Sequence, residues 1–282
     1  MARRLTVRRL RTRDRAAALA RLAASPHGNL LVIDAVHASG LGTFPGDARS
    51  DVLAALEGRE LAGVVSLQPT LALEDGAPPD VLDAFLPHLL ALTAGLLKVR
   101  AEAAEAVWAP LRRVGRRALL DRYETAYATP PAEVPAVAPP PGACVRAARS
   151  GDLEALVHAA RASLREEHRP DPFEGDPVGF RRWVAGRLPR ATVVEEDGAP
   201  RFVGYADVQR AEGWLLQGVY TWPEARRRGL AAAGVAALCR RARAAGAAHV
   251  QLAVVEGNEA AERLYERLGF RPFARLRTIL FG

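Results

Sequence analysis

A chain of 282 residues is long enough for two domains, each able to bury a hydrophobic core. Apolar residues make up 49% of the sequence and charged residues 25%, which is typical of a soluble globular protein. No apolar run approaches the roughly 18 residues of a membrane-spanning helix, and no apolar segment follows the basic start as an export signal requires. Two cysteines are too few for a disulfide framework or a zinc site. These features predict a cytoplasmic protein without a metal or a membrane partner.

The net charge of +7 and the sequence pI of 10.2 raise the question of nucleic acid as a partner. Almost all of the basic charge is arginine, with Lys98 as the lone lysine, and the arginines are interspersed with acids rather than gathered beside aromatic residues. We therefore attribute the charge to composition and do not expect nucleic-acid binding. Salt-sensitive retention on nucleic acid would test this interpretation.

The first half of the chain alternates strand-like and helix-like segments, as judged by the spacing of apolar residues. Asp14 is expected to cap the first helix, and the segment 25–29 is expected to break the chain after it. The expected strands are 5–10, 53–56, 61–67, 96–99 and 118–126, the second and third forming a hairpin; the expected helices are 15–24, 80–93 and 102–114, and 30–39 is either helix or strand.

A proline-rich segment, 130–142, follows and is expected to be extended and fairly stiff. The sequence pattern then restarts. Val7–Asp14 (VRRLRTRD) corresponds to Val145–Asp152 (VRAARSGD), and Glu102–Glu105 (EAAE) corresponds to Glu259–Glu262 (EAAE). Gly63 likewise corresponds to Gly204. The sequence therefore predicts a tandem duplication.

The second half is predicted to follow the same alternation. Asp152 is expected to cap its first helix, and Gly269–Phe270 is expected to close its last one. The expected helices are 153–167, 176–188, 230 to about 245, and 259–268, the last with Ala261, Leu264, Tyr265 and Leu268 on one stripe; the expected strands are 191–194, 201–208, 215–220 and 249–255.

An arginine-rich turn joins the strand 215–220 to the helix that follows. The free N–H groups of a first helical turn carry partial positive charge and attract an anion. Gly229 lets the backbone approach that anion closely, and a small residue two positions later keeps the next turn clear. A solvated arginine-rich helix start is the alternative interpretation. The residues of the turn are Arg226, Arg227, Arg228, Gly229, Leu230 and Ala231.

This turn and the helix after it together resemble the GNAT acetyltransferase superfamily, from about Cys144 to the end of the chain. The matching pattern is Arg226, Gly229 and Ala231, followed in the family's order and spacing by Asn258, Ala261, Tyr265, Gly269 and Phe270. The resemblance implies the α/β (mixed α+β) class: two tandem acyl-CoA N-acyltransferase (GNAT) folds, each a twisted mixed sheet flanked by helices. It also implies that acetyl-CoA lies between two diverging strands with its pyrophosphate on the arginine/glycine turn.

The resemblance further implies an amine that attacks the thioester of acetyl-CoA. Backbone N–H groups near Val219 and Tyr220 would polarise the thioester carbonyl, and Asn258 would lie beside the cofactor. Tyr265 is the candidate acid that protonates the leaving thiolate. Two structural alternatives stay open: Tyr265 as a core aromatic on the packed stripe, and Asn258 as an N-cap. With Val219, Tyr220 and Asn258, the residues of the turn, Arg226 to Ala231, complete the candidate cofactor site.

The sequence does not identify the general base that would take the proton of the amine. Many relatives carry a glutamate where this chain has Gln217, whose amide cannot accept a proton at neutral pH. A water chain to Glu166, Glu167, His168 or Glu212 is one alternative, and an acceptor amine of lowered pKa is another. The acid-rich connection 166–174 is expected to border the acceptor site; its acids would suit a cationic amine, with a solvated loop as the plainer interpretation.

The first half lacks these features in the corresponding region, 75–80. That segment carries two acids and no arginine, and Pro78 and Pro79 remove two of the N–H groups that a phosphate would need. Ala101 stands in place of Asn258. Trp108 replaces the tyrosine. In having one such half, the chain resembles tandem acetyltransferases with unequal halves. We therefore expect a degenerate domain at 1–129, a linker at 130–142 and a catalytic domain at 143–282.

The sequence thus predicts an N-acetyltransferase that moves an acetyl group from acetyl-CoA to the primary amine of a small molecule or peptide. A non-catalytic acyl-CoA-binding regulatory protein is the alternative, and release of free CoA with a panel of amines would separate the two. The oligomeric state stays open, with a homodimer as one form.

Overall fold

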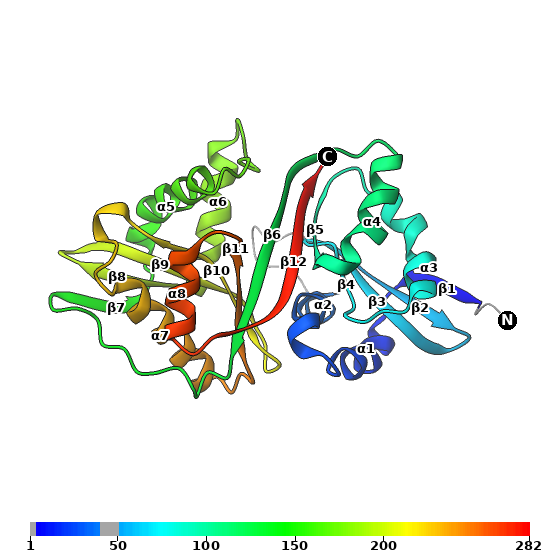
Figure 1. Cartoon of the computed structure of the whole chain (residues 1–282), viewed down its shortest axis with the longest axis horizontal. Helices are drawn as coiled ribbons and strands as arrows, with labels where there is room; N and C mark the ends of the chain where they lie inside the picture. The colour runs from blue at the N-terminus through cyan, green and yellow to red at the C-terminus, as the bar shows by residue number, and fades with distance from the viewer. Residues whose placement is uncertain (1–3, 40–50) are drawn as a thin grey trace. The chain divides into compact units, whose positions relative to one another are not determined.

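The computed structural model describes residues 4–39 and 51–282, so the first three residues of the basic start lie outside the description. The chain forms two compact units (Figure 1). The N-terminal unit consists of Met1–Thr125 together with Ala274–Gly282, and the C-terminal unit is Ala126–Phe273. The sequence-based division had placed Ala274–Gly282 with the second domain, whereas compactness assigns these residues to the first.

The N-terminal unit has a four-stranded sheet in the order β1-β2-β3-β4. Strand β5 follows it through a parallel bridge between Leu71 and Leu97, and Leu276–Phe281 of β12 pairs antiparallel with β5. The elements are β1 Leu5–Arg9, α1 Arg15–Leu22, α2 Pro26–Ala38, β2 Asp51–Glu57, β3 Glu60–Gln68, β4 Ala72–Leu73, α3 Pro79–Leu90, β5 Gly95–Arg100, α4 Ala101–Arg113, β6 Ala118–Thr129 and β12 Arg271–Phe281, the last two extending into the C-terminal unit.

The C-terminal unit repeats this arrangement with strands in the order β7-β8-β9-β10-β11. The pairings β7–β8, β8–β9 and β9–β10 are antiparallel, and β10–β11 is parallel, as in a mixed sheet. The elements are β7 Ala143–Ala147, α5 Leu153–Glu166, α6 Pro177–Arg187, β8 Ala191–Glu196, β9 Ala199–Gln209, β10 Trp214–Thr221, α7 Leu230–Ala244, β11 Val250–Val255 and α8 Glu259–Arg267.

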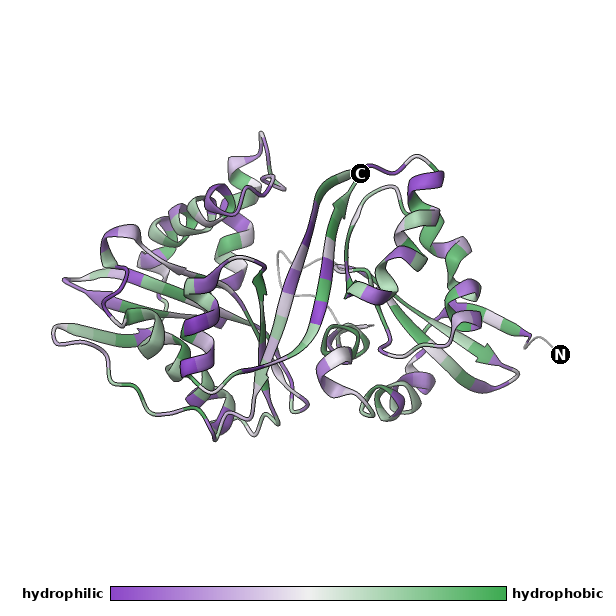
Figure 2. Cartoon of the chain, in the orientation of Figure 1, coloured by the Kyte–Doolittle hydropathy of each residue, from purple (hydrophilic) through white to green (hydrophobic). Residues whose placement is uncertain are grey.

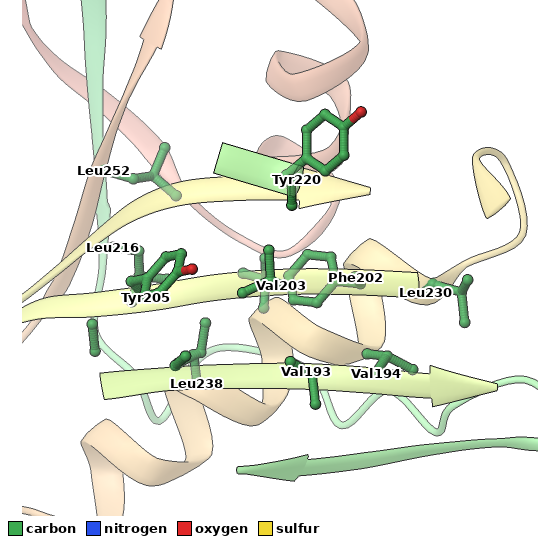
Figure 3. Close-up of a cluster of buried hydrophobic side chains, with 14 of the residues drawn as sticks. Val193, Val194, Phe202, Val203, Tyr205, Leu216, Tyr220, Leu230, Leu238 and Leu252 are labelled. Carbon is green, nitrogen blue, oxygen red and sulfur yellow. The ribbon is translucent and has the colours of Figure 1, made fainter. Parts of the chain in front are cut away.

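Helices cover both faces of the C-terminal sheet. Alternate residues of β9 face opposite sides, and each side contacts a different helix. Phe202 and Gly204 face α7: a Cβ placed on Gly204 would lie 3.0 Å from Leu238 of that helix. Tyr205 faces the other side, where Arg187 of α6 stacks on its ring. Figure 3 shows the buried side chains of β8, β9 and α7 packed together in this unit.

Equivalent glycines support the predicted duplication. Gly63 of β3 leaves room for Val81 of α3, as Gly204 of β9 leaves room for Leu238 of α7. A larger residue at either position would push the following helix off the sheet. Helices of both units carry purple and green stretches in Figure 2, as amphipathic helices do. The tandem mixed α/β fold expected from the sequence is confirmed.

The predicted capping roles of Asp14 and Asp152 are wrong. Neither carboxylate makes a capping hydrogen bond to the helix that follows it. Asp14 instead accepts hydrogen bonds from Arg8 at 2.6 and 3.1 Å and from the Arg11 N–H. Asp152 repeats this geometry with Arg146, at 2.6 and 2.8 Å. Each carboxylate therefore ties the end of a first strand to the turn that leaves it.

One further detail differs from the sequence expectations, and one open alternative is settled. The expected break at 25–29 is a helix start, because Pro26 occupies the first position of α2, where its missing N–H costs nothing. The segment 30–39, left as helix or strand, is helical to Ala38. Within the described ranges, 4–39 and 51–282, no helix combines the length and the hydropathy that crossing a bilayer would require.

Candidate functional site

A bulge interrupts strand β10 directly before its end. Gln217 pairs with Tyr205 and Tyr220 pairs with Val203, so two residues of β10 oppose a single residue of β9. The first of them, Gly218, has φ of 57°, a left-handed conformation that glycine adopts without strain. The bulge takes the backbone groups of Gly218 and Val219 out of the regular ladder. The bulge therefore gives this end of β10 a backbone geometry that the rest of the strand does not have.

The parallel pairing of β10 with β11 covers only the start of the two strands. Trp214 pairs with Val250 and Leu215 with Gln251, but no later residue of β10 is paired with β11. Both strands nevertheless continue, to Thr221 and Val255. The two strands therefore stop pairing after Leu215, ahead of the bulge, as diverging strands do.

A stacked arginine supports the bulge from the α6 side. The Arg187 guanidinium lies 3.9 Å from the centre of the Tyr205 ring and 4.7 Å from that of Trp183. It also donates two hydrogen bonds to Asp207. A Cβ on Gly218 would lie 3.0 Å from the Tyr205 ring and 3.3 Å from Arg187, so these side chains leave space only for glycine.

The first turn of α7 presents unpaired backbone donors. The helix begins at Leu230, and Gly229 precedes it with φ of 85°. The first backbone hydrogen bond of the helix runs from the Ala233 N–H to the Gly229 carbonyl, so the N–H groups ahead of Ala233 have no intrahelical acceptor. A Cβ on Gly229 would meet nothing nearer than Pro140, at 3.9 Å. Space and donors for an anion are thus present together.

The arginines of this turn are held by carboxylates of the same unit. Arg228 makes a bidentate pair with Glu196, at 2.9 and 2.5 Å. Arg226 donates to both oxygens of Glu166, at 2.8 and 2.7 Å, and to the Thr221 carbonyl. Arg227 lies between them with φ of 63°. The carboxylates keep the guanidinium groups beside the turn, although both arginines are nearly half exposed.

Glu166 also reaches strand β10. It accepts a hydrogen bond from the Tyr220 hydroxyl at 3.0 Å, and Figure 3 shows that hydroxyl directed away from the strand. Burial and the Glu166 carboxylate both raise the pKa of Tyr220. Glu166 therefore links the end of α5, the strand that carries the bulge and the arginine turn.

Tyr265 lies on α8 and is 5% exposed. Its ring packs edge-on against Phe270, with centroids 5.7 Å apart. Burial raises the pKa of its phenol above the ordinary value, with smaller contributions from Cys239 and Glu167. The packing alternative for the ring is therefore realised. The same burial keeps the hydroxyl protonated, as a proton donor must be.

Asn258 caps α8: its side-chain oxygen accepts a hydrogen bond from the Ala261 N–H at 3.2 Å. The N-cap alternative is confirmed, and this bond uses the side-chain oxygen while its NH₂ group stays available as a donor. Gln217 is exposed on β10. Its amide lies where a side-chain base would have been expected.

The corresponding helix start in the N-terminal unit is built differently. Pro78 precedes α3 and Pro79 occupies its first position, so two N–H groups are absent. Asp75 before them accepts hydrogen bonds from Arg100 and from the Ser25 hydroxyl, the latter at 2.7 Å. A Cβ on Gly28 would lie 2.3 Å from this carboxylate. The side chains of the unit itself therefore fill the space.

Residues 153–270 match the model of the acetyltransferase (GNAT) family. The segment runs from the start of α5 to the residue that closes α8, so it contains the bulge, the arginine turn and Tyr265. The C-terminal unit is thus a GNAT domain. A search of curated proteins finds no match to the chain.

Solved structures resemble the chain over nearly its whole length. A Drosophila protein is 15% identical, with a TM-score of 0.73 over 97% of this chain and 98% of that one. A GCN5-related N-acetyltransferase from Sphaerobacter thermophilus is 17% identical, with a TM-score of 0.60 over 98% and 94%. A tandem GNAT protein from the clavulanic acid biosynthesis pathway is 16% identical, with 0.55 over 99% and 98%. These likenesses show the fold.

Sequence reasoning missed the groups that surround the bulge. Arg187 and Asp207 belong to α6 and β9, and no motif joins them. Glu196 is not part of the site's sequence pattern, yet it holds Arg228. A signal was available for Gly218, since a glycine inside a strand pattern indicates a bulge.

Proposed function

We propose that the C-terminal unit is an N-acetyltransferase that uses acetyl-CoA and transfers the acetyl group to an amine. The observation that carries the proposal is the continuous path from the bulge at Gly218 to the open helix start at Gly229. One segment of chain thus offers backbone donors for a carbonyl oxygen and, a few residues later, for an anion. The N-terminal unit is proposed to be degenerate, with 130–142 as the linker between the two.

The residues present fit acetyl-CoA, judged by their donors and their free space. The N–H groups of Gly229, Leu230 and Ala231 would bind the pyrophosphate, with Arg227 and Arg228 adding positive charge. Free N–H groups suit an anion in a way that side chains alone do not, because they are fixed by the helix. When bound, acetyl-CoA supplies the activated acetyl group.

The bulge and α8 supply the remaining groups. The N–H groups of Val219 and Tyr220 would polarise the thioester carbonyl, and Asn258 would contact the cofactor while it caps α8. Tyr265 would give its phenolic proton to the departing sulfur. Glu166 lies beside β10 as a carboxylate that could take the proton of the amine through water, since Gln217 cannot.

Calorimetry on the full chain tests the proposal. We expect one acetyl-CoA per chain, because among the helices of residues 4–39 and 51–282 the start of α7 alone combines free donors with a glycine at φ of 85°. Two equivalents per chain would contradict the assignment to a single unit. Release of free CoA with a panel of primary amines then tests catalysis.

A second function, acyl-CoA binding without catalysis, is favoured by Gln217 in place of a base. Tight binding of acetyl-CoA together with no CoA release above the amine-free rate would support it. The two functions therefore differ in one measured quantity, the amine-dependent rate of thiol release.

A further inference from the structure

The connection between α5 and α6 forms a pocket of about 460 Å³ within the C-terminal unit. Its apolar wall includes Leu164 and Phe173, and its charged groups are those of Arg161, Arg165, Arg169, Asp171 and Glu174. The sequence of this connection suggested acids that would suit a cation. The folded chain brings three guanidinium groups to the pocket against two carboxylates.

Helical spacing explains why the arginines converge. Arg161 and Arg165 are four residues apart on α5, so they lie on one face of the helix, one turn above the other. Arg169 follows just after the helix end. The sequence alone separates these residues by acids such as Glu166, which point instead to Tyr220 and Arg226.

Arg161 carries a buried donor without an acceptor. Its Nε is buried and has no hydrogen-bond partner among the described residues. The nearest carboxylate oxygen, on Asp171, is 4.0 Å away, beyond hydrogen-bond distance. The other oxygen of Asp171 accepts the Phe173 N–H at 2.9 Å. Phe180 lies under the guanidinium, with its ring centre 4.7 Å away. An unsatisfied buried donor costs stability that a ligand oxygen would restore.

Arg165 adds a second available cation. It is exposed and has no ion-pair partner within residues 4–39 and 51–282. Arg169 is less available, since it lies 3.7 Å from Glu167 and has further interactions. Arginine binds carboxylate and phosphate oxygens with paired N–H groups. Two neighbouring arginines, one with a vacant donor, thus form a site for an oxyanion.

The end of α5 contributes residues both to the pocket and to the contacts of strand β10. Arg165 is followed directly by Glu166, whose carboxylate accepts the hydrogen bond from Tyr220 of β10. An acceptor with its oxyanion at Arg161 and Arg165 would have to pass the end of α5 for its amine to reach the bulge. Leu164 and Phe173 would contact its methylene groups.

We propose that this pocket binds an acidic group, carboxylate or phosphate, of the acceptor amine. The inference rests on the proposed function, because it names the class of acceptor for that site. It predicts that the acceptor is an amine with an anionic group at its far end. A polycationic amine would instead meet the guanidinium groups and bind poorly.

Anion titration tests the pocket on the full chain saturated with acetyl-CoA, so that the turn at Gly229 is already filled. Inorganic phosphate and malonate are titrated separately, which distinguishes the two kinds of oxyanion. We expect saturable binding in the roughly millimolar range for at least one of them. The double variant Arg161→Gln/Arg165→Gln should bind about tenfold more weakly, because it loses charge-assisted hydrogen bonds.

Arg181→Gln is the matched control. Arg181 lies on the neighbouring helix, is exposed and pairs with Glu154, so this variant loses one positive charge, against two in the double variant, without touching the pocket. It should bind both anions like the parent, and all three proteins should bind acetyl-CoA equally. Absence of saturable binding of either anion to the parent, or parent-like binding by the double variant, would overturn the proposal. If the parent protein does not bind acetyl-CoA at all, the proposed function is overturned instead.

Matched pairs of acceptors then test specificity: 2-aminoethyl phosphate against ethanolamine, and β-alanine against its amide. We expect the acidic member of a pair to have the higher kcat/KM by about tenfold. The double variant should lose this preference through the acceptor KM, with the acetyl-CoA KM unchanged. Equal or higher kcat/KM for the neutral members would overturn the proposal.

Discussion

The starts of α7 and α3 occupy the same place in two copies of one fold, and they differ in almost every group that could meet an anion. Before α7 stand three arginines and a glycine with φ of 85°, and its first turn contains no acid. Before α3 stand Pro78 and the carboxylate of Asp75, and Pro79 and Asp80 lie in its first turn. One helix start offers donors and positive charge. The other lacks donors and carries negative charge.

The strands that lead to these helices differ in the same sense. β10 has eight residues and a bulge, whereas β4 has two residues. The frame around them is retained, since the strand order and the arginine–aspartate pairs at Arg8 and Arg146 recur. Both units therefore share the same strand order and the same arginine–aspartate pair after the first strand. The proposed binding of acetyl-CoA would depend on one strand end and one turn.

Tyr265→Phe should give the largest effect if the C-terminal unit alone is catalytic. The variant keeps the ring against Phe270, so stability should fall by at most about 1 kcal/mol. It loses the proton donor, so kcat should fall by roughly 10² to 10⁴ with acetyl-CoA affinity nearly unchanged. Steady-state kinetics and urea unfolding measure the two quantities.

The matched change in the other unit is Trp108→Phe. Trp108 is 2% exposed and packs against Phe281, so its loss should lower stability. It should leave kcat unaltered. A Tyr265→Phe enzyme within about threefold of the parent rate would assign Tyr265 to packing and return the proton donation to water.

Phe281→Ala tests whether the N-terminal unit depends on the last strand. The side chain is 1% exposed in the core of that unit, so truncation should cost about 3 to 5 kcal/mol of unfolding free energy. Leu119→Ala, on an exposed leucine of the same unit, should cost under about 0.5 kcal/mol. Equal losses for the two variants would refute the assignment of β12 to this core.

Gly229→Val separates ligand binding from backbone strain. Valine at φ of 85° is strained and crowds the turn, so the Kd for acetyl-CoA should rise by about 10- to 100-fold. Gly246→Val is the control: Gly246 follows the other end of α7 with φ of 76° and has open space around it. Its strain should be similar and its Kd unaltered. A similar rise in Kd for both variants would mean that Gly229 affects acetyl-CoA binding only through the stability of the fold.

The arginine–aspartate pairs give the smallest effects and test the shared frame. Arg146→Met removes the guanidinium that pairs with both Asp152 and Glu195, so it should cost about 1 to 3 kcal/mol. Arg8→Met should cost less, because Arg8 is more exposed and serves one carboxylate. Urea unfolding of both variants beside the parent measures the two losses.

The pH dependence of these pairs follows from the carboxylates. The hydrogen bond from arginine lowers the pKa of Asp14 and of Asp152. Their stabilisation is therefore complete above the unfolded aspartate pKa of about 3.9 and disappears as pH falls through the folded value. The difference between parent and variant should shrink at low pH. A difference that stays constant below pH of about 3 would contradict the ion-pair explanation.

The sequence predicted the tandem fold and most elements, because apolar spacing and glycine positions report local structure. It placed the arginine turn, since three arginines and Gly229 stand together in the chain. It could not predict how those arginines are held, because Glu166 and Glu196 come from other elements. The sequence repeat correctly aligns Asp14 with Asp152. It does not show that each aspartate pairs with the arginine six residues earlier, Arg8 or Arg146, instead of capping a helix.

The pairing of β12 with β5 also sets an order of assembly. Ile279 and Phe281 are buried in the N-terminal core, but they are made only after the whole of Ala126–Phe273 has been synthesised. While the ribosome translates that segment, β5 has an unpaired edge and its core lacks two large side chains. The unit encoded first is thus the unit that can be completed only last, and until then its exposed edge is open to a chaperone.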